Sequence, residues 1–117
     1  MAGWSGRARR ILEEAGMTVS EKEVRYRTLT GEAIGESRVT GYSRDGLLKI
    51  SLSQREGEGY VRVSVTARGA ASRASLAESL EAQGASVDFE EGERMHAVLK
   101  RVPPSDVDRV LRDILES

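Results

Sequence analysis

The sequence predicts one α+β domain in which helices cover mainly one face of a β-sheet. Three segments carry apolar residues at helical spacing, and several short segments between them alternate apolar with polar residues. Glycine-containing turns separate the alternating segments, as expected for strands joined by hairpins. At 117 residues, the chain can bury about two thirds of its unfolded surface in a single core, so no second domain is needed.

Three helices are expected, over residues 4–15, 72–83 and 105–116. The last has the clearest pattern, because its apolar residues fall at i, i+3, i+4 and i+7 and so share one face. Those residues are Val107, Val110, Leu111, Ile114 and Leu115. Ser105, followed three residues later by Asp108, resembles a capping box at the start of this helix.

Six strands are expected, at about residues 24–30, 38–44, 47–53, 60–68, 85–90 and 94–102. Asp45-Gly46 lies between two alternating segments and predicts a two-residue type I′ turn, because both turn positions need a positive φ. That turn places Tyr42 opposite Lys49 and keeps apolar residues of the two strands on the same face.

The order of the elements predicts the topology of the sheet. Strand 60–68, the second helix and strand 85–90 should form a right-handed βαβ unit, and strand 94–102 returns between the two parallel strands. The result is a split βαβ unit and an antiparallel or mixed, permuted ferredoxin-like sheet, with the strands before residue 45 extending its edge. The first helix either joins the helical layer or covers that edge. The layout is similar to that of RRM-type folds, but the aromatic-rich consensus of that family is absent, so membership does not follow.

Composition excludes several classes of function. Lys and Arg total 18 and Asp and Glu total 19, so any attraction to an anionic partner must be local. No apolar run approaches the roughly 20 residues of a membrane span, and the first residues lack a signal-peptide pattern, which predicts a cytoplasmic protein without a membrane partner. Cysteine is absent, which excludes disulfides, thiolate nucleophiles and cysteine-ligated zinc. No cofactor is expected.

Residue usage also bears on the source of the chain. Asparagine is absent and glutamine occurs only at Gln54 and Gln83, a pattern typical of hyperthermophile proteins. A GC-rich genome would also produce the excess of arginine over lysine.

The outward positions of the strands between residues 38 and 68 carry Arg, Lys, Ser, Thr and Tyr and no acid. Because the later helices should cover the apolar side of these strands, this basic side is expected to remain open. Bases stack on aromatic rings while Arg and Lys neutralise phosphates, so such a face can bind single-stranded nucleic acid. The candidate binding residues are Arg38, Tyr42, Arg44, Lys49, Tyr60, Arg62 and Arg68, with Tyr42 and Tyr60 as the stacking rings.

Two other interpretations fit the same pattern. Exposed strand faces favour Thr, Ser, Arg and Tyr for solubility and β-propensity alone, so the face can simply be solvated. It can also meet a protein partner or a second copy, as can a sheet edge. The predicted function is a small non-enzymatic module that binds RNA or single-stranded DNA. The alternative is a protein-interaction or self-assembling domain, and a small-molecule enzyme is the least favoured reading.

A second candidate lies where the strand ending at Arg68 passes into the second helix. Gly69, Ser72 and Arg73 could hold a phosphate there, using free N–H groups, a hydroxyl and a guanidinium. An ordinary helix N-cap explains the same residues, because no complete phosphate-binding motif is present.

The remaining polar residues do not predict catalysis or metal binding. His96 lies in an apolar strand without a cysteine partner and fits a packed or edge residue better than a base or ligand. Asp88, Glu90, Glu91 and Glu93 surround a turn without the spacing of a hard-cation loop. Trp4 fits a core anchor of the first helix or a group that fills a partner's groove.

Overall fold

The computed structural model describes residues 3–69, 73–90 and 94–116, which form an α+β fold. Its elements in chain order are α1 (Gly3–Glu14), β1 (Thr18–Arg27), β2 (Ala33–Tyr42), β3 (Leu48–Arg55), β4 (Val61–Arg68), α2 (Arg73–Ala82), β5 (Ser86–Glu90), β6 (Arg94–Val102), the 3-10 turn η1 (Pro104–Asp106) and α3 (Val107–Leu115).

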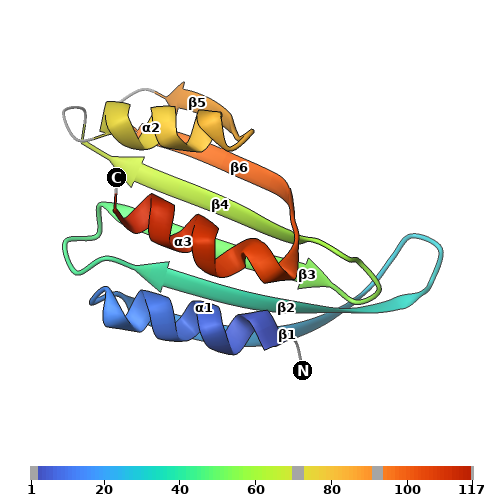
Figure 1. Ribbon diagram of the computed structural model, residues 1–117. Helices are drawn as coiled ribbons and strands as arrows, with labels where there is room; N and C mark the ends of the chain where they lie inside the picture. The colour runs from blue at the N-terminus through green and yellow to red at the C-terminus, as the bar shows by residue number, and fades with distance from the viewer. Residues whose placement is uncertain (1–2, 70–72, 91–93, 117) are drawn as a thin grey trace.

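The strands form one six-stranded sheet in the order β1-β2-β3-β4-β6-β5, and every neighbouring pair is antiparallel. Strand β6 returns between β4 and β5, and β1 and β2 extend the sheet beyond β3, as the connections in the sequence predict. All three helices lie on the same side of this sheet (Figure 1). Helix α1 therefore joins the helical layer and packs against β1, β2 and α3.

Alternation along the central strands fills the core between the sheet and the helices. Residues of β4 at every second position are fully buried, and their neighbours on β3 and β6 complete the same apolar layer. This layer includes Val61, Val63, Val65, Ala67, Ile50, Leu52, Met95, Ala97 and Leu99. Arg62, Ser64 and Thr66 alternate with the buried residues of β4 and point to the opposite side, which confirms the predicted orientation.

Helix α1 is held closely against β2 and is joined to β3 by a hydrogen bond. A Cβ atom on Gly41 would lie 3.1 Å from Cδ1 of Leu12 and 3.4 Å from Cε of Met17, so β2 needs a glycine where the end of α1 approaches it. Trp4 is buried, and its indole N–H donates a 2.8 Å hydrogen bond to Oε1 of Gln54. Trp4 is therefore a core anchor, and the second interpretation of this residue is wrong.

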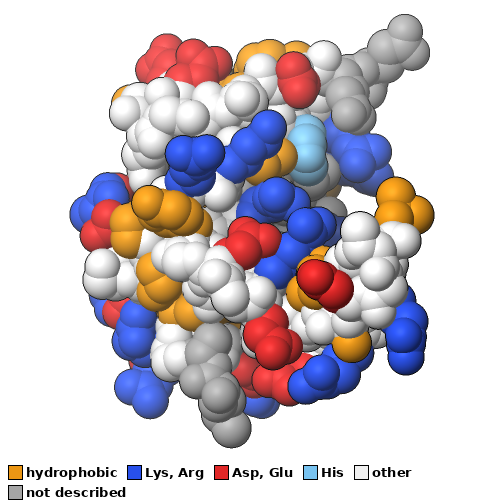
Figure 2. Space-filling model, turned by 90° about the vertical axis from the view of Figure 1, so that its right-hand side faces the viewer, with side chains coloured by type: hydrophobic (Ala, Val, Ile, Leu, Met, Phe, Trp, Pro, Cys, Tyr) orange, Lys and Arg blue, Asp and Glu red, His pale blue; other side chains and the backbone are white. Residues whose placement is uncertain are grey.

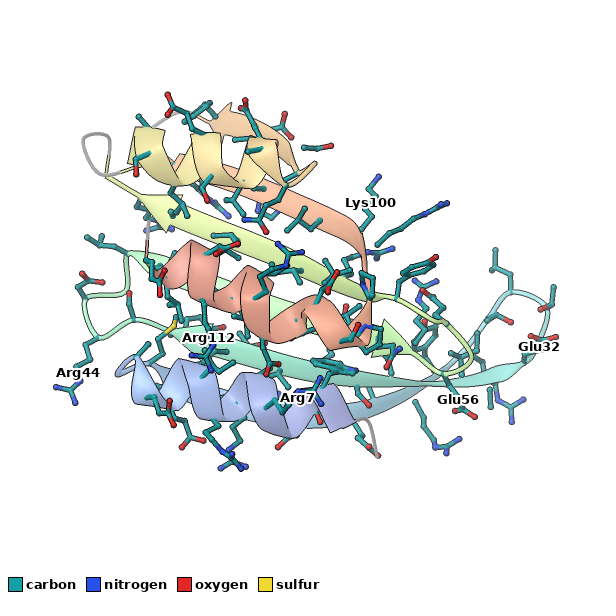
Figure 3. The ribbon with its side chains drawn as sticks, in the orientation of Figure 1. Arg7, Glu32, Arg44, Glu56, Lys100 and Arg112 are labelled. Carbon is teal, nitrogen blue, oxygen red and sulfur yellow. The ribbon has the colours of Figure 1, made fainter. Side chains whose placement is uncertain are left out.

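The start of α3 differs from the expected capping box. The chain forms the 3-10 turn before α3, and no side chain caps the helix from Asp106. Asp108 instead accepts a 3.0 Å hydrogen bond from Nε of Arg7, whose guanidinium also donates to the carbonyl of Pro104 at 2.9 Å. The carboxylate expected to cap α3 thus joins α3 to α1, and Arg7 is labelled between these helices in Figure 3.

The turn between β2 and β3 is also longer than expected. The N–H of Gly46 donates to the carbonyl of Ser43 at 3.0 Å, so Arg44 and Asp45 occupy the two central positions of the turn. A carboxylate oxygen of Asp45 accepts from the N–H of Leu47 at 2.9 Å, which stabilises this wider loop. The predicted two-residue turn is wrong, although Tyr42 does pair with Lys49. Arg44 consequently lies in the turn and not on a strand face.

The first hairpin begins earlier and is longer than the sequence suggested. Strand β1 starts at Thr18 rather than at about residue 24, and β2 starts at Ala33 rather than at about residue 38. The two strands are joined by a tight turn in which the N–H of Thr28 donates to the carbonyl of Glu32 at 2.9 Å. Charged residues occupy much of β1, and this obscures the apolar alternation that would have marked the strand.

Truncation of α3 provides a test of the core. Leu111 has no exposed surface, so Leu111→Ala should lower the free energy of unfolding by about 2 to 5 kcal/mol, measured by urea denaturation. The matched control is Leu29→Ala in the β1–β2 turn, where the side chain is fully exposed and the expected change is within about 0.5 kcal/mol. A loss at Leu111 as small as that at Leu29 would place α3 outside the core.

Candidate functional site

The candidate site is the side of the sheet opposite the helices, which we call the open face. Its middle row consists of hydroxyl side chains that pair across neighbouring strands: Thr40 with Ser51, and Ser51 with Ser64. The hydroxyls of Thr40 and Ser51 lie 3.3 Å apart and share a hydrogen bond. These side chains are only partly exposed, although every described helix lies on the other face. The longer side chains on either side of the row therefore provide most of the reach of this surface.

A first group of cations lies on the open face near the β2–β3 turn. Nζ of Lys49 is 5.6 Å from the centroid of the Tyr42 ring, a cation–π contact between directly paired residues. Arg68 pairs with Arg94 on the neighbouring strand β6. Lys49 is diagonal to Arg68 across β3 and β4, so the three residues lie near one another on the same part of the open face. We call Lys49, Arg68 and Arg94 the turn-end cations.

A second group lies beyond the hydroxyl row. Lys22 pairs with Arg38, Arg38 with Ser53, and Ser53 with Arg62, so the row crosses β1 to β4. The side chains of Lys22, Arg38 and Arg62 are exposed. We call these three residues the mid-sheet cations. Four residues separate Ser53 from Lys49 along β3, which places the two groups about 13 Å apart.

One acid occupies the open face beside the mid-sheet cations. Oε1 of Glu36 lies 3.1 Å from Nε of Arg38, and the side chain of Glu36 is only 11% exposed whereas that of Arg38 is 49% exposed. The hydrogen bond to Glu36, with the attraction of its charge, raises the pKa of Arg38. Arg38 therefore already has an anionic partner. The outward strand positions between residues 38 and 68 contain no acid, and Glu36 lies just before that range.

An aromatic contact lies at the end of the open face near the β1–β2 hairpin. The guanidinium of Arg55 is 5.8 Å from the centroid of the Tyr26 ring. The same guanidinium is 3.8 Å from a carboxylate oxygen of Glu58. Figure 2 views the molecule from the end where this hairpin lies, and it shows red carboxylates between the blue Lys and Arg side chains. Because Glu36 lies beside Arg38 and Glu58 lies beside Arg55, the positive charge in this part of the molecule is not continuous.

The structure brings together most of the residues predicted for nucleic-acid binding. Arg38, Tyr42, Lys49, Arg62 and Arg68 occupy the open face, with the cations in the two groups described above. Their placement there follows from the confirmed alternation of β2, β3 and β4. Arg44 does not belong to them, because it lies in the turn and projects beyond the end of the sheet (Figure 3).

The two predicted stacking rings do not form one platform. Tyr42 pairs with Lys49, which pairs with Thr66 of β4. Tyr60 lies immediately before β4 and precedes Thr66 by six residues. Six residues of a strand span about 20 Å, so the rings lie toward opposite ends of the sheet. Both are exposed, at 46% for Tyr42 and 48% for Tyr60. Each ring can stack on a base, but not on adjacent bases in the same stack.

Sequence reasoning did not place Lys22, Arg94 or His96 on the open face. The alternation of strand 94–102, placed beside strand 60–68 by the predicted topology, was a sufficient signal for the last two residues. Arg94 pairs with Arg68 and His96 with Thr66, so both occupy the open face. Nδ1 of His96 and the Thr66 hydroxyl share a 3.0 Å hydrogen bond, which gives the imidazole a structural partner on the neighbouring strand.

The other sequence candidates are only partly described. Gly69 follows β4 and has a φ of 98°, a conformation that favours glycine. Ser72 and the side chain of Arg73 lie outside the described residues. Asp88 is exposed on β5, while Glu91 and Glu93 lie outside the described residues. Within the described parts of the chain, no cluster of three or more Asp, Glu or His side chains is arranged to hold a metal ion.

Comparisons with known proteins do not assign a family. No protein-family model matches the chain, and no curated protein matches it at a significant level. None of the helices in the described ranges is both long enough and apolar enough to cross a bilayer. Inferences about function therefore depend on the open face itself.

Proposed function

We propose that the protein binds RNA or single-stranded DNA through the open face of its sheet. The observation that carries this proposal is the uncovered strand surface, on which turn-end and mid-sheet cations flank a row of hydroxyls. Lys49 and Arg62 represent the two groups and are exposed. Cations of this kind neutralise phosphates, hydroxyls donate to phosphate oxygens, and exposed tyrosines stack on bases.

The charge distribution supports a local mode of binding. The whole chain has a formal net charge of −1, so long-range attraction to a polyanion is weak. Screening at physiological salt limits the reach of each cation to about 8 Å, and contact with the open face must therefore be direct. Binding of this kind should be modest in affinity and strongly dependent on salt.

We also propose that this sheet is a permuted ferredoxin-like sheet. The strand order β3-β4-β6-β5 and the position of α2 between β4 and β5 in the sequence support a split βαβ unit. Such a sheet, with helices on one face, leaves the other face available as a flat binding surface.

The primary experiment is a titration of the protein with a mixed-sequence single-stranded oligonucleotide, followed by fluorescence anisotropy at several salt concentrations. Arg62→Ala and Lys49→Ala should each weaken binding and each reduce the slope of log K against log salt by about 0.7, the value for one lost phosphate contact on a single strand. The matched control is Arg10→Ala on the exposed side of α1, which should leave both quantities unchanged.

Absence of binding by the wild-type protein at low salt would overturn the proposal. A second outcome would favour a protein interface on the same face: Arg62→Ala changes the oligomeric mass in solution and leaves oligonucleotide binding unchanged.

A substitution at Glu36 should strengthen binding, whereas the substitutions above should weaken it. Glu36→Gln removes the negative charge beside Arg38 while retaining an oxygen that can accept its hydrogen bond. The freed charge of Arg38 should tighten oligonucleotide binding and steepen the salt slope by about 0.7. Glu14→Gln, an equal change of charge on the exposed side of α1, should do neither. If Glu36→Gln binds like the wild type, the mid-sheet cations do not contact the nucleic acid.

Tyr60 tests stacking separately from charge. Tyr60→Ala should reduce the binding free energy by about 1 to 3 kcal/mol with little change in salt slope, because a stacked base releases no counterions. Tyr60→Phe keeps the ring and should bind as the wild type does. Equal losses for Tyr60→Ala and Tyr60→Phe would assign the effect to the hydroxyl and contradict stacking.

A further inference from the structure

Strand β1 is an edge strand of the sheet, with β2 on one side and no strand of the described chain on the other. Thr28 and Glu32 continue the series of opposed residues in β1 and β2, and the N–H of Thr28 donates to the carbonyl of Glu32. Antiparallel strands bond to each neighbour through alternate residues, so the even-numbered residues of β1 bond to β2. The odd-numbered residues therefore direct their N–H and C=O groups away from the sheet.

The odd-numbered residues carry an ordered series of charges. Glu21 and Glu23 are followed by Arg25 and Arg27, all with exposed side chains. When two copies of one strand pair antiparallel, one copy runs in reverse. The glutamates of each copy can then lie opposite the arginines of the other. Glu23 and Arg25 make no ion pair within the described chain, whereas Glu21 lies 3.3 Å from Arg9. The two central charges of the series are thus available to a second molecule.

One register satisfies both the backbone and the charges. With Val24 opposite Val24 of a second copy, Glu23 faces Arg25 and Glu21 faces Arg27, and each contact occurs twice by symmetry. These charged positions are the outward-bonding residues, so they can exchange backbone hydrogen bonds across the junction. On the other side of the strand, Lys22 faces the ring of Tyr26, a pair suited to a cation–π contact.

Neighbouring registers place like charges together. A shift that sets Glu23 opposite Glu23 opposes two carboxylates at the centre, and a shift that sets Arg25 opposite Arg25 opposes two guanidiniums. Shifts by an odd number of residues bring outward-bonding residues opposite residues already bonded to β2. Charges on an edge strand commonly prevent pairing, but here their order favours one specific pairing.

We propose that two copies of this chain associate through β1 in the register that places Val24 opposite Val24. The two-fold axis is perpendicular to the sheet, so the sheets of both copies join into one and their helices remain on the same side. The open faces also become continuous across the junction. The proposal does not depend on nucleic-acid binding.

The test is the mass in solution across a concentration series, measured by sedimentation equilibrium. The wild type should show a monomer–dimer equilibrium. Arg25→Glu sets Glu23 against a glutamate twice, and Glu23→Arg sets Arg25 against an arginine twice, so each should weaken dimerisation roughly tenfold or more. Arg10→Glu, an equal reversal on α1, should leave the equilibrium unchanged, and circular dichroism checks that each variant is folded.

Restoration of complementarity tests the register itself. The double variant Glu23→Arg/Arg25→Glu again opposes unlike charges and should dimerise as the wild type does. An equimolar mixture of the two single variants should form a heterodimer. In that heterodimer, positions 23 and 25 of one copy are both acidic and face positions 25 and 23 of the other, which are both basic. A wild type that is monomeric at every concentration, single variants that dimerise normally, or the absence of rescue in both combinations would overturn the proposal.

Discussion

The burial of every second residue of β4 is the constraint on which the rest of the structure depends. Val61, Val63 and Val65 lie under the helical layer, so Arg62 must point to the other face. A slip of one residue would place a guanidinium in the apolar layer without an anionic partner, at a cost of several kcal/mol. This constraint determines both where the helices pack and which side chains remain for a partner. The open face is thus a direct consequence of the core.

The charges of the open face are organised more finely than the balance of acids and bases suggests. Glu36 is nearly covered by its surroundings and holds Arg38, whereas Lys49 lies over an aromatic ring. Cations next to internal partners are held in fixed directions, and this lowers the entropy lost when an anion arrives. The same contacts also reduce the attraction available to that anion. At Arg38, the contact with Glu36 thus fixes the direction of the guanidinium but weakens its attraction for an anion. Among the described residues, Arg62 has no such acid contact.

The sequence predicted the central part of the fold better than its boundaries. Alternation and the short connections determined the order of the last four strands, the buried side of each and the pairing of Tyr42 with Lys49. The turn at Arg44 was missed because the side chain of Asp45 stabilises a longer loop, an interaction that dipeptide preference does not include. The open face was only partly predicted, since Glu36 precedes the strand expected at about residues 38–44. It becomes a neighbour of Arg38 on the same face only because β2 begins at Ala33.

The contact between α1 and α3 has a consequence for synthesis of the chain. Arg7 and Asp108 are separated by 101 positions, so the ribosome makes α1 long before the helix that packs beside it. During that interval the β1–β2 and β2–β3 hairpins can form from local contacts, but one side of α1 still lacks its neighbour. A nascent chain stalled before residue 104 should therefore expose apolar surface that chaperones recognise, and release from them should coincide with emergence of the last helix.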